Sequence, residues 1–281
     1  MASLSEVRRV PVRLGAVQET LLVPLLGRAE QTRQRTGLID DPKAVEIVES
    51  LDYDFSKWMG TQSLVGATIR AQLFDREVRD FLDQHPDGTV VEIGAGLNTR
   101  YERLDNGRAQ WIELDLPDSL SLRRQFFEDT ERRHMVAANV MDSSWHQELA
   151  QHRGPYCFVS EAVLIYLDEP QVETTLRQLV EKFPGSTLVM DTTSAKMVDG
   201  QAKHDIMKHL PPESWFRWKC DDPKALDDWG LRLSKSLSLA DSPPSTVAAM
   251  PWTYRMMLRF VPALVRRMVQ GYRINRFVFE T

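Results

Sequence analysis

The chain of 281 residues contains few cysteines and has no long apolar run. Its two cysteines, Cys157 and Cys220, are too few for a disulfide framework or a cysteine-ligated zinc site, which favours a reducing, cytoplasmic setting and no metal. The only apolar run near the N-terminus, residues 21–26, is interrupted by Pro24. It is too short to cross a bilayer and is not followed by the small residues of a leader-cleavage site. We therefore expect a soluble cytoplasmic protein.

The sequence also lacks a dominant charge of one sign. Its 35 basic and 40 acidic residues are mixed along the chain and give a net charge of −5. Nucleic-acid-binding proteins favour a basic face, so this balance argues against such a partner. There are no internal repeats or low-complexity segments. The length allows a large core, as one domain with an elaboration or as two small domains.

The most informative stretch is residues 90–100, where a short apolar run leads into two glycines, Gly94 and Gly96. This pattern predicts a buried parallel strand that opens into a loop approached closely by a ligand. A dinucleotide-binding loop would have a third glycine where Thr99 stands, and the Gly-Lys-Ser/Thr of a phosphate loop is absent. The remaining interpretation is a cofactor with a ribose and an adenine but no phosphate, namely S-adenosyl-L-methionine.

Strand and helix patterns alternate from this stretch onward, which predicts an α/β fold with a parallel sheet. The expected strands are residues 90–93, 110–117, 136–141, 156–159, 187–190, 231–239 (outer and antiparallel) and 273–279. The expected helices include residues 14–35, a short one after Asp41-Pro42, 63–84, one from Ser119, and one from Asp168 to Pro184.

Acidic residues end four of the expected strands: Glu92, Asp115, Glu161 and Asp191. The carboxyl ends of parallel strands meet at the edge where ligands bind, so these acids should gather there. Asp115 lies 23 residues after Glu92, close to the position of an acid that accepts hydrogen bonds from both ribose hydroxyls. Glu113 alternates with it and is the less favoured ligand.

Three further positions have two interpretations each. Arg70, on or near the buried side of the helix over 63–84, is either a solvated arginine or the partner of the methionine carboxylate. Asp142 and Ser143, expected at the end of the third strand, either meet the adenine or form a surface turn.

Residues 194–229 interrupt the alternation and are rich in aromatic residues, which favours either a substrate lid or a small core within an insertion. His204 and His209 in this segment are candidate general bases or surface histidines. Arg217 and Lys219 either pair with an acceptor carboxylate or are solvated. Residues 252–270 are expected to be helical; a packed helix pair divided at Pro262 is preferred to a membrane-surface helix.

Several of these motifs occur in order and together resemble the leucine carboxyl methyltransferase family, particularly its bacterial branch of polyketide O-methyltransferases. The resemblance covers roughly residues 28–191. The motifs that carry it are Arg70, residues 94–100, residues 113–117, Asp142 and residues 160–167. One departure is Asn98, where the family usually has aspartate.

The resemblance implies a class I methyltransferase fold, a seven-stranded and mostly parallel sheet whose last strand is antiparallel. It also implies roles for single residues: Arg70 for the methionine carboxylate, Gly94 and Gly96 at the methionine moiety, Asp115 for the ribose, Asp142 and Ser143 for the adenine, Glu161 for positioning the donor and Tyr166 near the acceptor.

The sequence thus predicts an S-adenosyl-L-methionine-dependent O-methyltransferase of secondary metabolism. It would act by direct in-line transfer on a small, polyketide-like acceptor, through a carboxylate or a phenolic hydroxyl. A helical cover over 1–60 would precede a methyltransferase domain over 61–281, with a lid at about 194–229. We expect no nucleic-acid or membrane partner and a monomer or homodimer. The alternatives are a catalytically silent S-adenosyl-L-methionine-binding protein and a nicotinamide-dependent oxidoreductase.

Overall fold

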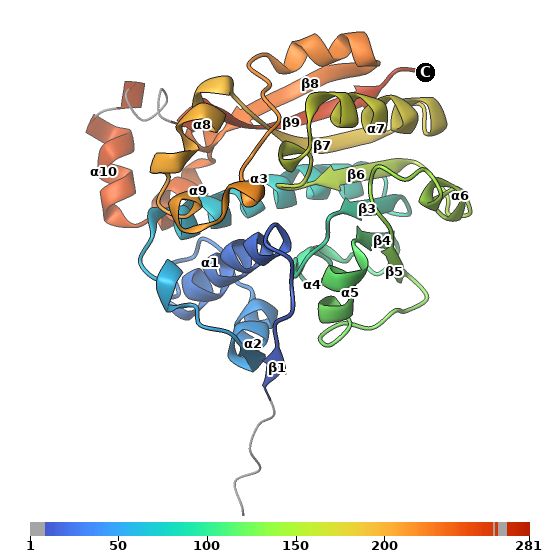
Figure 1. Ribbon diagram of the computed structural model, residues 1–281. Helices are drawn as coiled ribbons and strands as arrows, with labels where there is room; N and C mark the ends of the chain where they lie inside the picture. The colour runs from blue at the N-terminus through green and yellow to red at the C-terminus, as the bar shows by residue number, and fades with distance from the viewer. Residues whose placement is uncertain (1–8, 261, 264–268) are drawn as a thin grey trace, which may run out of the picture.

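A seven-stranded sheet forms the centre of the protein in a computed structural model that describes residues 9–260, 262–263 and 269–281 (Figure 1). The strand order is β5-β4-β3-β6-β7-β9-β8. The strands are β3 (Thr89–Ile93), β4 (Gln110–Asp115), β5 (Arg133–Ala137), β6 (Tyr156–Ser160), β7 (Thr187–Thr193), β8 (Leu231–Ser238) and β9 (Tyr272–Phe279).

The first five strands of the sheet run parallel, and β9 is inserted antiparallel between β7 and β8. The predicted mostly parallel seven-stranded sheet with an antiparallel last strand is therefore confirmed. The chain leaves the central strand β3 towards β4 on one side and later returns to β6 on the other. This reversal opens a crevice at the carboxyl ends of β3 and β6, the place where ligands bind in open α/β sheets.

Helices cover both faces of the sheet (Figure 1). They are α1 (Leu22–Arg33), α2 (Pro42–Ser50), α3 (Gln62–Gln84), α4 (Arg100–Leu104), α5 (Pro117–Arg123), α6 (Trp145–Leu149), α7 (Glu169–Lys182), α8 (Ala195–Gly200), α9 (Pro244–Ala249) and α10 (Trp252–Phe260). Between α8 and β8 lie only short 3-10 helices, in the segment predicted to be a lid. No helix in the described part of the chain is long and apolar enough to cross a membrane.

Local sequence signals account for the ends of several helices. Asp41 caps α2 by accepting a hydrogen bond from Ala44 N at 3.0 Å, and Pro42 occupies the first turn, where its missing N–H costs nothing. Asp168 and Gln171 form a reciprocal capping box at the start of α7, the helix expected from Asp168. Helix α1 packs against α2 and α3, which joins the N-terminal segment to the main body.

Two predicted boundaries were wrong. The helix expected over 14–35 begins later, with a 3-10 turn at Gln18–Leu21 followed by α1. The third strand was expected over 136–141 but runs over Arg133–Ala137, because Arg133 is buried in an ion pair with Glu113 of the neighbouring strand. Asp142 therefore does not end a strand. Of the helical segment expected over 252–270, α10 (Trp252–Phe260) and residues 262–263 and 269 are helical, and residues 261 and 264–268 lie outside the described part of the chain.

Candidate active site

The loop after β3 passes close to the facing segment and has no room for side chains. Gly94 and Gly96 have φ angles of 67° and 47°, a region that other residues rarely adopt. A Cβ atom on Gly94 would lie 2.2 Å from Cγ2 of Val163. The two glycines identified in the sequence thus serve both the turn and the close approach.

Two buried arginines hold the backbone of this loop by its carbonyl oxygens. Arg123 Nη1 donates to the carbonyls of Gly96 and Asn98 at 2.8 Å each, and Arg28 Nη2 donates to that of Leu97 at 2.8 Å. With its carbonyls fixed from behind, the loop has a defined shape before any ligand arrives.

Acidic residues neutralise both arginines. Glu113 binds Arg123 at 2.5 Å and Asp41 binds Arg28 at 2.9 Å. Glu113, the alternative to Asp115 for the ribose, is committed to this ion pair and to Arg133. Asp115 lies beside the loop instead, where its Oδ2 accepts from Gly96 N at 2.6 Å and its Oδ1 from Leu116 N at 2.7 Å.

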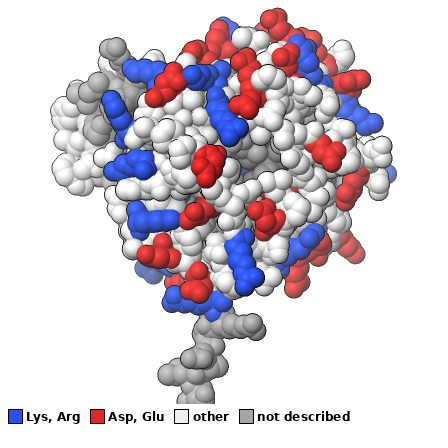
Figure 2. Space-filling model, viewed as in Figure 1, with Lys and Arg blue, Asp and Glu red and all other residues white. Residues whose placement is uncertain are grey.

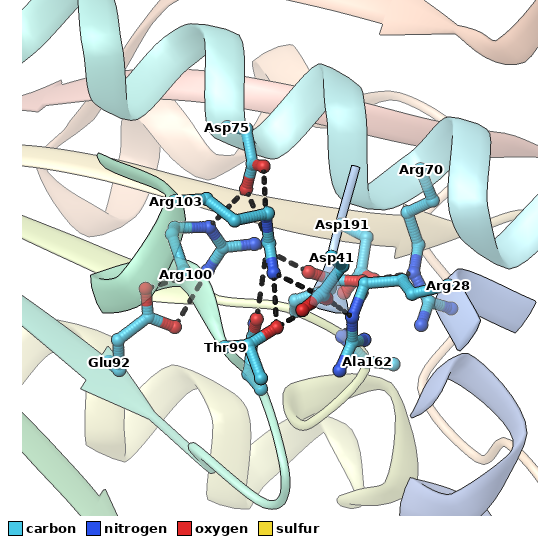
Figure 3. A network of polar contacts seen from close by, with 12 residues as sticks. Arg28, Asp41, Arg70, Asp75, Glu92, Thr99, Arg100, Arg103, Ala162 and Asp191 are labelled. Carbon is cyan, nitrogen blue, oxygen red and sulfur yellow. Dashed lines mark hydrogen bonds and ion pairs between the residues drawn. The ribbon is translucent and has the colours of Figure 1, made fainter. Parts of the chain in front are cut away.

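A chain of ion pairs connects this loop with helix α3 (Figure 3). Arg100 binds Asp75 at 2.8 Å, Glu92 at 2.7 Å and Glu161 at 2.6 Å. Arg103 binds the same Asp75 at 2.8 Å. Burial acts to raise the pKa of Asp75, but the two guanidinium groups outweigh it and hold this pKa at about 2.

Arg70 lies at the wall of the crevice, between β6 and β9. Its Nε donates to Glu161 at 2.8 Å and its Nη1 to the Tyr272 hydroxyl at 3.2 Å. The Tyr272 hydroxyl in turn donates to Asp191, which also accepts from Ala162 N at 2.8 Å. Burial raises the pKa of Asp191 to about 6, whereas Arg70 and Arg100 outweigh burial at Glu161 and hold its pKa below the usual value.

A cavity of about 840 Å³ opens in front of these residues. Its polar wall contains Arg28, Arg70, Gly94, Gly96, Asn98 and Glu161. Apolar residues of the lining come from the N-terminal segment and the predicted lid, with Leu21, Val23, Met197, Ile206, Met207, Leu210 and Phe216. The cavity thus combines charged and apolar lining.

The structure brings most, but not all, of the predicted site residues together. The residues that line the cavity are Arg70, Gly94, Gly96, Glu161, Tyr166 and His204. Asp115 touches the same loop through Gly96. Like Asp115, the following predicted residues lie outside the lining: Asp142 and Ser143, on an exposed loop after β5, and the exposed His209. Arg217 and Lys219 are exposed and pair with Asp168 and Asp199, respectively.

Both ring nitrogens of His204 already have partners. Its Nδ1 accepts from the backbone N–H groups of Ile206 and Met207 at 3.3 and 3.4 Å. The proton of the neutral ring therefore belongs on Nε2, which faces Ser63 Oγ at 3.2 Å. Ser63 Oγ donates onward to Asp205, so the ring is part of a hydrogen-bonded chain between the lid and α3.

A family model described as leucine carboxyl methyltransferase matches residues 22–180. The chain belongs to this family. It is therefore an S-adenosyl-L-methionine-dependent methyltransferase, which confirms the predicted enzyme class and cofactor.

Individual relatives of this methyltransferase come from bacteria and fungi. The tetracenomycin polyketide synthesis O-methyltransferase TcmP of Streptomyces glaucescens is 30% identical over 236 residues, which are 83% of this chain and 86% of that protein. The S-adenosyl-L-methionine-dependent methyltransferase dpfgK of Gibberella zeae is 25% identical over 239 residues, 77% of this chain and 79% of that protein.

Solved structures agree with the fold. A Streptomyces avermitilis protein of the DUF574 family superposes with a TM-score of 0.58 at 12% identity, covering 86% of this chain and 89% of that one. A Thermobifida fusca protein assigned as a methyltransferase gives a TM-score of 0.57 at 17% identity, covering 91% and 95%. At these identities the likeness concerns the fold alone.

The site of this methyltransferase fits the cofactor. The turn at Gly94 presents loop backbone to the cavity, a carboxylate stands beside the loop at Asp115, and a cation and a carboxylate face the cavity at Arg70 and Glu161. Sequence reasoning did not identify Arg123 or Tyr272, which shape the site from behind. The available signal was the pairing of buried charges: Glu113 inside an apolar strand requires a nearby cation.

Proposed function

We propose that this methyltransferase transfers a methyl group to an oxygen atom of a small, largely apolar acceptor of the polyketide-like class. The observation that carries the proposal is the cavity itself, whose lining combines the charged residues around the β3 loop with apolar residues of the N-terminal segment and the predicted lid. A volume of about 840 Å³ is in the upper part of the range for small-molecule sites, which suits a donor and an acceptor held side by side.

The residues that would hold S-adenosyl-L-methionine lie on and around the loop after β3. Arg70 offers a cation for a carboxylate, the turn at Gly94 and Gly96 admits a ligand against its backbone, and Asp115 offers acceptor oxygens for hydroxyl groups. Glu161 would orient the donor. When bound, the cofactor supplies an electrophilic methyl group on a sulfonium. Asp142 and Ser143 remain our proposal for the adenine contact.

The state of the candidate bases favours an acceptor that is already ionised. Of the two histidines proposed as bases, His204 has both nitrogens engaged and His209 lies outside the lining. Burial raises the pKa of Tyr166, which keeps this phenol protonated and suited to donating a hydrogen bond. A carboxylate acceptor needs no base, so we favour a carboxylate over a phenolic hydroxyl as the methyl acceptor. Alignment and exclusion of water by the lid would then be the main contributions of the protein.

Calorimetry with S-adenosyl-L-methionine, S-adenosylhomocysteine and NAD tests the donor site. We expect both S-adenosyl ligands to bind and NAD to give no heat. Asp115→Ala should weaken S-adenosylhomocysteine by about tenfold or more, because a hydrogen-bonding carboxylate is lost. The exposed Asp83→Ala on α3 is the matched control and should leave affinity unchanged. Unchanged affinity in Asp115→Ala would mean that the ribose ligand is misassigned.

Turnover with matched aromatic acids and phenols tests the acceptor. With labelled donor, an aromatic acid should be converted to its methyl ester with kcat/KM nearly independent of pH between about 6 and 9, above the pKa of a carboxyl group. A phenol should lose activity below its own pKa. Donor binding with no turnover of any acceptor would support the silent binding protein instead.

A further inference from the structure

Helix α10 presents a row of large apolar side chains to solvent. Trp252, Met256 and Phe260 are spaced four residues apart, so they lie on one face of the helix. Their exposed fractions are 67%, 43% and 66%. Scattered exposed apolar residues are ordinary on a protein surface, but three of this size in one row form a continuous patch.

The opposite face of α10 is attached to the body of the protein, which fixes the direction of the exposed row. Tyr254 and Leu258 pack against the core cluster under α3. The Tyr254 hydroxyl also donates to the carbonyl of Gln62 at 3.2 Å. The helix therefore cannot turn its apolar row inward without giving up these contacts.

Both charged residues of α10 are arginines. Arg255 and Arg259 are exposed and flank the row on one side, and Arg259 lies over the Phe260 ring. Between Asp241 and Glu280 the sequence contains six arginines and no acidic residue, although the whole chain has a net charge of −5. Figure 2 shows this uncharged surface at the edge of the molecule with basic side chains beside it, while both signs are mixed elsewhere on that face.

We propose that α10 binds the surface of an anionic lipid bilayer, with Trp252, Met256 and Phe260 inserted and the arginines at the headgroups. An amphipathic helix with Trp and Phe on one face and cations beside it is the type that lies in a membrane interface. A second copy fits less well, because a two-fold contact through this face would bring Arg255 and Arg259 of both copies together. The sequence alone favoured a packed helix pair without a membrane; the exposed row is what changes this expectation.

The position of α10 connects the surface with the cavity. Tyr254 belongs to the inner face of α10 and lines the cavity. Met59, 49% exposed, directly precedes Gly60, which also lines it. A bilayer at this face would therefore lie beside the cavity mouth, and an apolar acceptor dissolved in lipid would have a short path to it. This last step rests on the proposed function, but the binding itself does not.

Co-sedimentation of the full chain with lipid vesicles tests the proposal. We expect binding to vesicles of phosphatidylglycerol and phosphatidylcholine mixed at about 3:7 and little binding to phosphatidylcholine alone. The double variant Trp252→Ser, Phe260→Ser should reduce the partition coefficient at least about tenfold, because it removes most of the inserted apolar area. Arg255→Gln, Arg259→Gln should reduce it by about fivefold for each arginine and weaken its salt dependence.

Matched controls distinguish binding through α10 from non-specific adsorption to the vesicles. Met141→Ser removes an exposed apolar side chain elsewhere, and Arg177→Gln, Arg232→Gln removes two exposed charges from α7 and β8. Neither variant should change the partition coefficient. Sedimentation equilibrium gives the oligomeric state of each variant, and circular dichroism and binding of S-adenosylhomocysteine verify that it is folded. Absence of vesicle binding would overturn the proposal, as would a dimer of the native chain that the Trp252 and Phe260 changes dissociate.

Discussion

Gly94 shows how much a single missing side chain contributes to this site. Its φ of 67° and the 2.2 Å approach of a Cβ to Val163 mean that any other residue would be strained and would displace the segment after β6. That segment follows Glu161 and carries Ala162, whose N–H binds Asp191. The effect of a substitution should therefore reach the cofactor site.

We expect Gly94→Ala to weaken S-adenosylhomocysteine by about tenfold or more, from strain and a steric clash of roughly 1–3 kcal/mol. Calorimetry measures the effect. The control is Gly107→Ala, since Gly107 has a similar φ of 76° in an exposed loop and nothing within 4 Å of its Cβ position. Equal affinities in the two variants would show that close approach at Gly94 is irrelevant to the donor.

For single residues, the sequence predicted where the acidic side chains gather but not which side chains they bind. Glu92, Glu161 and Asp191 do meet at the carboxyl edge of the sheet, because parallel strands end there. Their partners Arg100 and Tyr272 come from α4 and β9, so only the tertiary fold pairs them. A single sequence contains no local signal for such distant pairs.

At the scale of elements, Asp205 supplies two of the hydrogen bonds that connect residues 194–229, the predicted lid, with helix α3. Asp205 accepts from Ser63 N at 3.1 Å and from Ser63 Oγ, in the first turn of α3. The N-cap residue Thr61 makes no side-chain cap of its own, so the lid supplies the acceptor that this helix end requires.

Asp205→Ala should release the lid while leaving the sheet intact. We expect faster limited proteolysis within 194–229 and a KM for the acceptor raised several-fold, with a loss of roughly 1 kcal/mol in the free energy of unfolding, the usual contribution of a helix cap. Asp199→Ala, in the same segment but paired with the exposed Lys219, is the control. Identical cleavage patterns for both variants would contradict the role assigned to Asp205.

Elements with strong periodicity or capping signals were predictable, and those shaped by buried charge were not. Helix α3 was expected over 63–84 and runs over Gln62–Gln84, because its apolar stripe is regular. The predicted start of strand β5 was three residues too late. An arginine is not expected in a buried strand unless its ion-pair partner is known, and here the partner is Glu113 of the neighbouring strand. The exposed row of α10 was missed because the same row is compatible with a packed helix.

At the scale of the whole molecule, the buried ion pairs make the free energy of unfolding depend on pH in the acidic range. The pKa of Asp75 is held at about 2 in the folded protein, below its value of roughly 3.9 in an unfolded chain. The folded state therefore favours the ionised form. The resulting stabilisation is fully present above about pH 4 and is lost as the pH falls towards 2.

This carboxylate alone should contribute about 2 kcal/mol of the change in unfolding free energy between pH 6 and pH 2. Urea denaturation at a series of pH values measures it. In Asp75→Asn the unfolding free energy at pH 6 should be clearly lower, and the difference from the native chain should shrink as the pH falls. Asp87→Asn is the control, because the pair of Asp87 with Arg108 is exposed and screened by solvent. A constant difference across the series would exclude titration of Asp75 as the cause.

The position of β9 also determines when the site can first exist. This strand lies between β7 and β8, both of which precede it in the chain, so the ribosome must release residues 272–279 before the two can be joined. Tyr272, which orients Asp191 and contacts Arg70, arrives with it. A nascent chain that already contains the β3 loop, Glu161 and the lid therefore still lacks one wall of its cofactor site. Cofactor capture must therefore follow the release of β9 from the ribosome, and binding then stabilises only molecules whose sheet is complete.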